Sequence, residues 1–81
     1  MELSDYRAQI DQIDRQLVEL FAQRMNTAAG IAAYKKEHGL PVLDPVRERE
    51  KLLDVAAQAP EDMRDYTASL YTMLFELSRC Y

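Results

Sequence analysis

The sequence has very few of the residues that stabilise a small domain by covalent or metal cross-links. It contains one cysteine (Cys80) and one histidine (His38) in 81 residues, so it forms no internal disulfide and supplies too few ligands for a structural zinc site. A chain of this length that folds alone buries only about 60% of its surface, and a metal, disulfides or a partner subunit usually adds the missing stability. We therefore expect oligomerisation, and no metal or cofactor.

The sequence also has no long apolar run and no excess of basic residues. No stretch approaches 18 consecutive apolar residues, and residues 1–5 are neither basic nor followed by an apolar run, which argues against a membrane span and a signal peptide. Ten Lys and Arg against fourteen Asp and Glu give a net charge of −4, which argues against a nucleic-acid-binding protein with a broad basic face. We expect a soluble cytoplasmic protein with neither nucleic acid nor membrane as a partner.

The few glycines and prolines divide the chain into three segments. The first extends from an N-cap at Ser4 to the residue before Gly39, which stands where a helix commonly ends. Asp44 followed by Pro45 is typical of a helix start, and Pro60 interrupts this second segment. β-Branched residues are sparse and no segment alternates with period two, so the sequence predicts an all-α fold.

The third segment has a helix start but no end signal. Pro60, Glu61 and Asp62 suit a first helical turn, because acidic side chains interact favourably with the positive end of the helix dipole. Apolar residues then recur at intervals of three and four as far as Leu77, and neither glycine nor proline follows before Tyr81. We expect three helices, one long and two shorter, in a single domain over residues 1–81, which can be the N-terminal part of a longer chain.

The first helix carries cations in a stripe that should be apolar. Alternating steps of four and three along it give Leu3, Arg7, Ile10, Asp14, Leu17, Phe21, Arg24, Ala28, Ile31 and Lys35. Six of these residues are apolar, as expected for a stripe against a partner helix, but three are cationic. A cation in such a stripe extends to solvent, pairs with an acid or binds an anionic ligand.

Helical geometry places two of these cations where one small dianion can lie between them. Arg24 and Lys35 are eleven residues apart, so they point to the same side about 16 Å apart along the axis. Arg7 lies about 25 Å from Arg24 and reaches that ligand only from an antiparallel second copy of the helix. With a two-fold axis near Val18, the spacing predicts a homodimer whose anion sites are shared between chains.

Most of the candidate residues also have an ordinary structural interpretation. Acidic side chains one helical turn away can neutralise Arg7. Ser78 can donate to its own helix backbone, and Asp44 can serve only as an N-cap. Arg47 and Glu48 can belong to a solvated charged face of the second helix.

An ordered set of residues extends along nearly the whole chain. It comprises Tyr6-Arg7, Ile10-Asp11, Ile13-Asp14, Leu17, Leu20, Arg24, Ile31-Ala32, Lys35, Pro41-Val42, Asp44 and Arg47-Glu48-Arg49-Glu50. This set resembles the all-helical chorismate mutases, in particular the mutase domain at the N-terminus of bifunctional chorismate mutase–prephenate dehydratases. The resemblance implies an intertwined homodimer that converts chorismate to prephenate without a cofactor, in phenylalanine and other aromatic amino-acid biosynthesis.

The resemblance also implies a role for each candidate cation of the first helix. Arg24 and Arg7 of the second chain would hold the two carboxylates of chorismate. Lys35 would contact the enolpyruvyl carboxylate and the ether oxygen. Arg7, Arg24 and Lys35 are therefore both the expected substrate-binding and the expected catalytic residues.

Later residues would complete the pocket by the same resemblance. The backbone at Asp44 and the carboxylate of Glu48 would bind the ring hydroxyl, Arg47 matches a further charged position, and Ser78 matches a hydroxyl near the ring carboxylate. The family places a second donor to the ether oxygen four residues after Ser78, which would be position 82. The sequence ends at Tyr81, so two alternatives stay open: the contact with the ether oxygen rests on Lys35 alone, or a residue after Tyr81 supplies the second donor.

The sequence lacks several kinds of catalytic group that this reaction does not need. The sequence has no nucleophile–histidine pair, phosphate-binding glycine loop or metal-ligand cluster, and a [3,3] rearrangement needs none of them. The protein has only to select a chair-like conformer and to stabilise negative charge on the ether oxygen. Two alternatives stay open: an isochorismate-pyruvate lyase, and a non-catalytic helical dimerisation or regulatory module.

Overall fold

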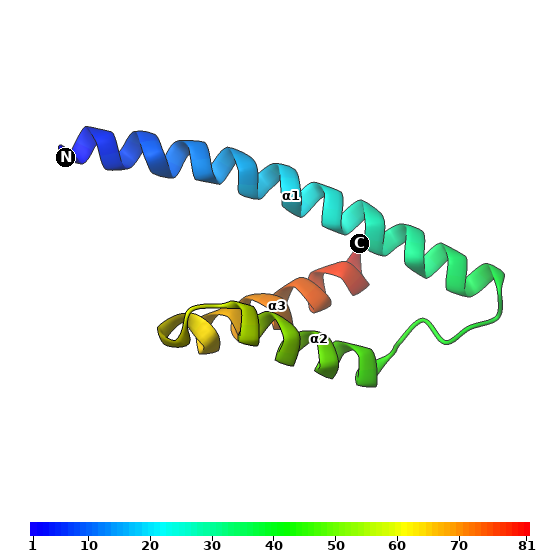
Figure 1. The fold of residues 1–81 in the computed structure, drawn as a ribbon. Coiled ribbons are helices and arrows are strands. Elements are labelled where there is room, and N and C mark those ends of the chain that lie inside the picture. The colour runs from blue at the N-terminus through cyan, green and yellow to red at the C-terminus, as the bar shows by residue number, and fades with distance from the viewer.

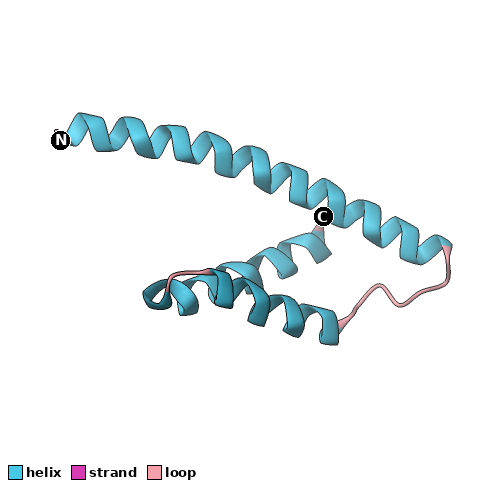
Figure 2. Ribbon diagram, in the orientation of Figure 1, coloured by secondary structure: helices cyan, strands magenta, loops and turns pink.

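A computed structural model describes all 81 residues and confirms the all-α fold with one long and two shorter helices. The helices are α1 (Leu3–Glu37), α2 (Pro45–Gln58) and α3 (Arg64–Cys80), and a 3-10 turn, η1 (Glu61–Met63), precedes α3. Helices α2 and α3 form an antiparallel hairpin, and the C-terminal end of α3 approaches the middle of α1 (Figure 1). The N-terminal half of α1 projects away from the hairpin, and one extended connection joins α1 to α2 (Figure 2).

The start of α1 differs slightly from the prediction. The helix begins at Leu3 with Glu2 as its N-cap, whereas the sequence predicted Ser4 in that position. The reason is Asp5, whose carboxylate accepts a 2.9 Å hydrogen bond from the backbone N–H of Glu2. Satisfying this amide extends the helix back past Ser4, because unpaired amides at a helix start need acceptors.

The end of α1 is where the sequence predicted it. Gly39 has a positive φ of 68°, a conformation that favours glycine because it has no Cβ. The N–H of Leu40 donates to the carbonyl of Lys35 at 2.7 Å, and the N–H of Gly39 donates to that of Lys36. These two bonds form a Schellman motif, which ends the helix and turns the chain towards α2.

The boundaries of α2 are also confirmed, whereas the start of α3 is not. The Asp44 carboxylate accepts a 3.0 Å hydrogen bond from the Arg47 N–H, and Pro45 occupies the first helical position. After Pro60 the chain makes a 3-10 turn, closed by the Met63 N–H to the Pro60 carbonyl at 2.8 Å, before α3 begins. The acidic residues that we assigned to the first turn of the third helix lie in this 3-10 turn.

A single chain has almost no hydrophobic core. Val55, on α2, is the one buried residue of 81. The accessible surface is 6840 Å², whereas a compact monomer of this mass would expose about 5000 Å². The radius of gyration is 15.9 Å, against about 12 Å for a compact domain of this length. The isolated chain is therefore much more open than a self-contained domain.

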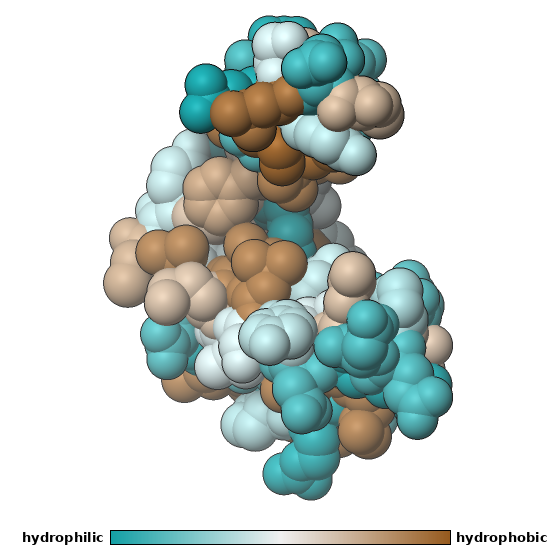
Figure 3. Space-filling model, turned by 90° about the vertical axis from the view of Figure 1, so that its left-hand side faces the viewer, coloured by the Kyte–Doolittle hydropathy of each residue, from teal (hydrophilic) through white to brown (hydrophobic).

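The exposed apolar surface is concentrated on α1. We call Leu3, Tyr6, Ile10, Ile13, Leu17 and Leu20 the α1 stripe; each of these side chains is about half exposed or more. Apolar side chains gather on the side of α1 that faces the hairpin, around a hollow between the two (Figure 3). Arg7 and Asp14 follow Tyr6 and Ile13, so they lie beside the stripe rather than within it. None of the three helices is long and apolar enough to cross a membrane.

Candidate active site

Of the three candidate cations on α1, Arg24 is the one that contacts another helix. Its side chain comes from the middle of α1, is half-buried, and donates a long hydrogen bond of 3.4 Å from Nη1 to Oγ of Ser78 on α3. Its guanidinium carbon lies 5.4 Å from the ring centroid of Tyr71 and 5.7 Å from that of Phe75. Both distances allow cation–π attraction. Tyr71, Phe75 and Ser78 follow one another at steps of four and three, so one face of α3 holds this guanidinium.

Ser78 makes one hydrogen bond within its own helix and one with Arg24. Its hydroxyl donates to the carbonyl of Leu74 at 2.8 Å, as expected for a serine within a helix. The hydroxyl oxygen still accepts from Arg24, and it lies 3.7 Å from the sulfur of Met25. Ser78 therefore gives the Arg24 side chain one long hydrogen bond, and the other guanidinium N–H groups donate to no group of the chain.

The other two candidate cations of α1 are not engaged within the chain. Lys35 is in the last turn of α1, half-buried, and belongs to neither of the chain's two ion pairs. Arg7 is exposed on the projecting half of α1 and is likewise in neither pair. One chain thus brings Arg24 and Ser78 together but leaves Arg7 far along the helix axis.

Asp44 and Arg47 lie together at the start of α2. The Asp44 side chain caps the helix through the backbone N–H of Arg47, which confirms its ordinary structural interpretation. The Arg47 side chain is exposed. The capping bond also fixes the direction of the first turn of α2, which carries Glu48.

Glu48 has a partner that sequence reasoning missed. Both of its carboxylate oxygens lie 2.6 Å from Nη2 of Arg79, near the C-terminal end of α3. The antiparallel hairpin brings these residues together although they are 31 positions apart. The only available signal was the hairpin itself, since a short connection returns late residues of α3 to the start of α2.

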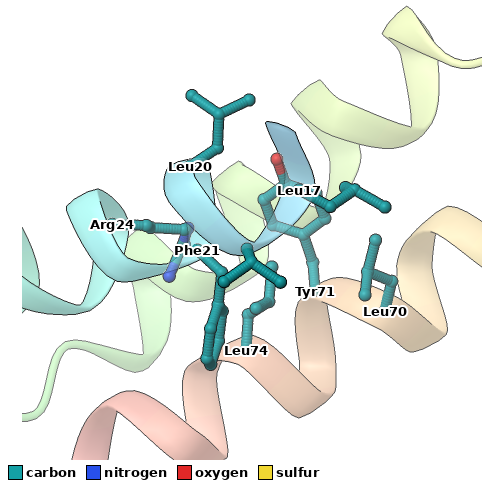
Figure 4. Close-up of a pocket in the computed structure, with 8 residues that line it drawn as sticks. Leu17, Leu20, Phe21, Arg24, Leu70, Tyr71 and Leu74 are labelled. Atoms are coloured by element: carbon teal, nitrogen blue, oxygen red, sulfur yellow. The ribbon is translucent and has the colours of Figure 1, made fainter. Parts of the chain in front are cut away.

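Two clefts flank Arg24. The first, of about 390 Å³, lies between α1 and α3; in Figure 4, Phe21 of α1 points towards α3 and Tyr71 of α3 points towards α1. Apart from Arg24, every residue that lines it is hydrophobic: Leu17, Val18, Leu20, Phe21, Leu70, Tyr71 and Leu74. This cleft is suited to apolar side chains.

The second cleft, of about 520 Å³, has a different character. It is lined by Leu20, Gln23, Arg24, Thr27, Ala28, Ile31 and Lys51. Lys51 comes from α2, one helical turn after Glu48, and had no role in the sequence analysis. Arg24 and Lys51 place two cations beside small and apolar side chains, which suits a small anion, although Lys51 also pairs with Asp54 at 3.5 Å.

Comparison with known proteins decides the family. The chain matches the chorismate mutase type II family over residues 6–81. It belongs to that family. The resemblance found in the sequence is thereby confirmed, and no solved structure shows a significant match.

Three curated relatives match part of the chain. The T-protein of Haemophilus influenzae is 44% identical over 46 residues, 57% of this chain and 12% of the relative. The chorismate mutase of Methanocaldococcus jannaschii is 38% identical over 48 residues, 59% of this chain and 48% of the relative. The 4-amino-4-deoxychorismate mutase of Streptomyces venezuelae is 37% identical over 46 residues, 57% of this chain and 45% of the relative. The matches thus span half or less of these relatives.

Proposed function

We propose that this chain is a chorismate mutase that rearranges chorismate to prephenate. Membership of the type II family supports the reaction, and one observation on the chain carries the proposal: a half-buried arginine, Arg24, is held against α3 beside a cleft that suits an anion. The substrate carries two carboxylates, which a pair of fixed cations can bind.

The proposed working form is a homodimer in which the two α1 helices pack antiparallel. Each chain exposes roughly 1,800 Å² more surface than a compact monomer of its mass, and an obligate dimer interface buries an area of this order. The α1 stripe supplies the apolar side chains, and the 390 Å³ apolar cleft beside Phe21 and Tyr71 can receive them. The lone buried Val55 supports this proposal, because so small a core does not stabilise a chain of this length.

Dimerisation would also complete the active site. Arg7 is 17 residues from Arg24 on one straight helix, about 25 Å away, so it joins the same ligand only from the second chain. The antiparallel arrangement places it between Arg24 and Lys35. In the proposed site, Arg24 and Arg7 of the second chain hold the substrate carboxylates.

Lys35 is the proposed electrostatic catalyst. In the rearrangement one carbon–oxygen bond breaks as a carbon–carbon bond forms, no proton moves, and negative charge develops on the ether oxygen. A lysine ammonium that is free of internal ion pairs can contact this oxygen and stabilise that charge. Loss of one such contact typically costs about 3 kcal/mol in the transition state, which is about a hundredfold in rate.

The remaining residues position the substrate in this proposal. Glu48 and the backbone at Asp44 bind the ring hydroxyl, Arg47 contributes charge at the entrance, and Ser78 orients Arg24. Holding the carboxylates and the hydroxyl at fixed points selects the compact conformer in which the reacting carbons meet. Conformer selection and charge stabilisation together account for the activity without a cofactor.

A single assay separates this proposal from its alternatives. The protein is mixed with chorismate or with isochorismate, and loss of substrate is followed by absorbance while prephenate and pyruvate are identified as products. Prephenate from chorismate supports the mutase, and pyruvate from isochorismate would support a lyase instead. A protein that turns over neither compound would be the non-catalytic helical module, and the proposed function would be rejected.

A further inference from the structure

The Glu48–Arg79 ion pair differs from the chain's other ion pair because it joins two helices. The other ion pair, Lys51 with Asp54, joins neighbours on one helix at 3.5 Å, whereas Glu48 and Arg79 link two helices. One guanidinium nitrogen lies 2.6 Å from both carboxylate oxygens. The side chains are 30% and 43% exposed, so water screens the pair in part but does not separate it.

Each member of the pair is close in sequence to a residue of the proposed substrate site. Arg79 directly follows Ser78, the residue that accepts a hydrogen bond from Arg24. Glu48 is one helical turn from Lys51, which lines the cleft suited to an anion. An arginine here faces the same carboxylate that, under the proposed function, meets the ring hydroxyl of the substrate.

We propose that Arg79 is a specificity-determining residue: by pairing with Glu48 it makes the site prefer a hydroxyl to an amino group on the substrate ring. The inference rests on the proposed function. Both substrates occur among the relatives of this chain, since one relative is named a chorismate mutase and another a 4-amino-4-deoxychorismate mutase. The two substrates differ at the ring position that Glu48 is proposed to contact.

The physical basis is the charge next to that position. An alkyl amine is largely protonated at neutral pH, so it would be attracted by an unpaired carboxylate. A guanidinium at 2.6 Å cancels most of the field of Glu48 and repels an ammonium group. A carboxylate in an ion pair keeps lone pairs that accept a hydrogen bond from a neutral hydroxyl, and Arg79 has further N–H groups that can donate to the hydroxyl oxygen.

The same pairing also favours a doubly negative substrate. Without Arg79, the carboxylate of Glu48 would stand uncompensated beside an incoming dianion, which would raise KM for chorismate. Because Arg79 acts on binding of the ring substituent and not on the ether oxygen, kcat for chorismate should change less than KM. For the amino substrate, removal of Arg79 also removes its repulsion of the ammonium group, and this gain offsets the rise in KM.

The test compares kcat/KM for chorismate and 4-amino-4-deoxychorismate in the wild-type protein and four variants at the same ionic strength. Arg79→Met and Arg79→Gln remove the charge, Arg79→Lys keeps it, and Arg64→Met removes an arginine from the exposed start of the same helix. For charges several ångströms apart near a protein surface, we expect the ratio of amino to hydroxyl substrate to rise about tenfold in Arg79→Met and Arg79→Gln. Arg79→Lys should largely restore the wild-type ratio, and Arg64→Met should leave it unchanged.

The outcomes separate this inference from the proposed function. If wild-type protein converts chorismate but the Arg79 variants lower both substrates by the same factor, the arginine is only structural and the specificity proposal is overturned. Combining Arg79→Met with Glu48→Gln must abolish the gain for the amino substrate, because no carboxylate is then present to attract it; a gain that persists also overturns the proposal. If wild-type protein converts neither substrate, both proposals fail.

Discussion

Mixing two inactive variants tests the shared site directly. Arg7→Ala and Arg24→Ala each remove one proposed carboxylate contact, and the residues are too far apart on α1 to serve one ligand from one chain. Each homodimer therefore carries two defective sites, and its turnover of chorismate should fall by about a hundredfold or more.

The magnitude of recovery follows from the geometry. In a heterodimer, Arg24 of the first variant and Arg7 of the second meet in one intact site, while both lesions fall in the other site. Random exchange of equal amounts yields one half heterodimers with one good site in two, so activity should recover to about one quarter of the wild-type value. A site built within one chain would instead give no recovery, because every site would keep a lesion.

The assay needs proof of exchange. The two variants carry different affinity tags, are mixed and incubated, and the doubly tagged species is isolated before chorismate disappearance is measured. The isolated heterodimer should reach about half of wild-type activity per mole of dimer. Doubly tagged protein that is as inactive as its parents would refute the shared site, and a purely monomeric protein would refute the dimer.

Three further predictions test separate parts of the structure. Lys35→Ala should lower kcat about a hundredfold with unchanged far-UV circular dichroism. Lys36 is the exposed neighbour, so Lys36→Ala should keep a kcat near wild type, and equal losses in the two variants would contradict a specific role for Lys35. Ile13→Asp, which places a charge in the α1 stripe, should shift the sedimentation mass towards the monomer and lower helicity, and a stable dimer would show that the stripe is not the interface. Gly39→Ala should lower the free energy of unfolding by about 1–2 kcal/mol, since its φ is 68°, and an unchanged denaturation midpoint would contradict the strain.

Local signals predicted most of the helix boundaries. The Asp44-Pro45 pair and Gly39 act through their own backbone geometry, so the sequence alone located the start of α2 and the end of α1. The start of α1 was missed because the carboxylate of Asp5 accepts from the N–H of Glu2, which precedes the predicted cap at Ser4. The start of α3 was missed because an acidic turn after proline suits both a 3-10 and an α-helical turn.

The arrangement of the candidate site residues was predictable only where it depends on periodicity within one helix. The spacing of Arg24 and Lys35 could be read from the repeat of α1. The contacts of Arg24 with Tyr71 and Phe75, and the pair between Glu48 and Arg79, arise from packing between segments far apart in sequence. No local pattern contains that information.

In the proposed dimer, assembly and chemistry depend on the same helix. The α1 stripe leaves the chain too open to be stable alone, and Arg7 lies directly beside the stripe on its projecting half. In the proposed dimer, association that covers the stripe would also deliver Arg7 to the second chain's Arg24. A monomer would lack both a core and a carboxylate contact, so an unassembled chain would bind chorismate weakly. Folding, dimerisation and formation of the site should accordingly occur in a single concentration-dependent transition, and the chorismate-converting activity should fall on dilution in step with the loss of helicity.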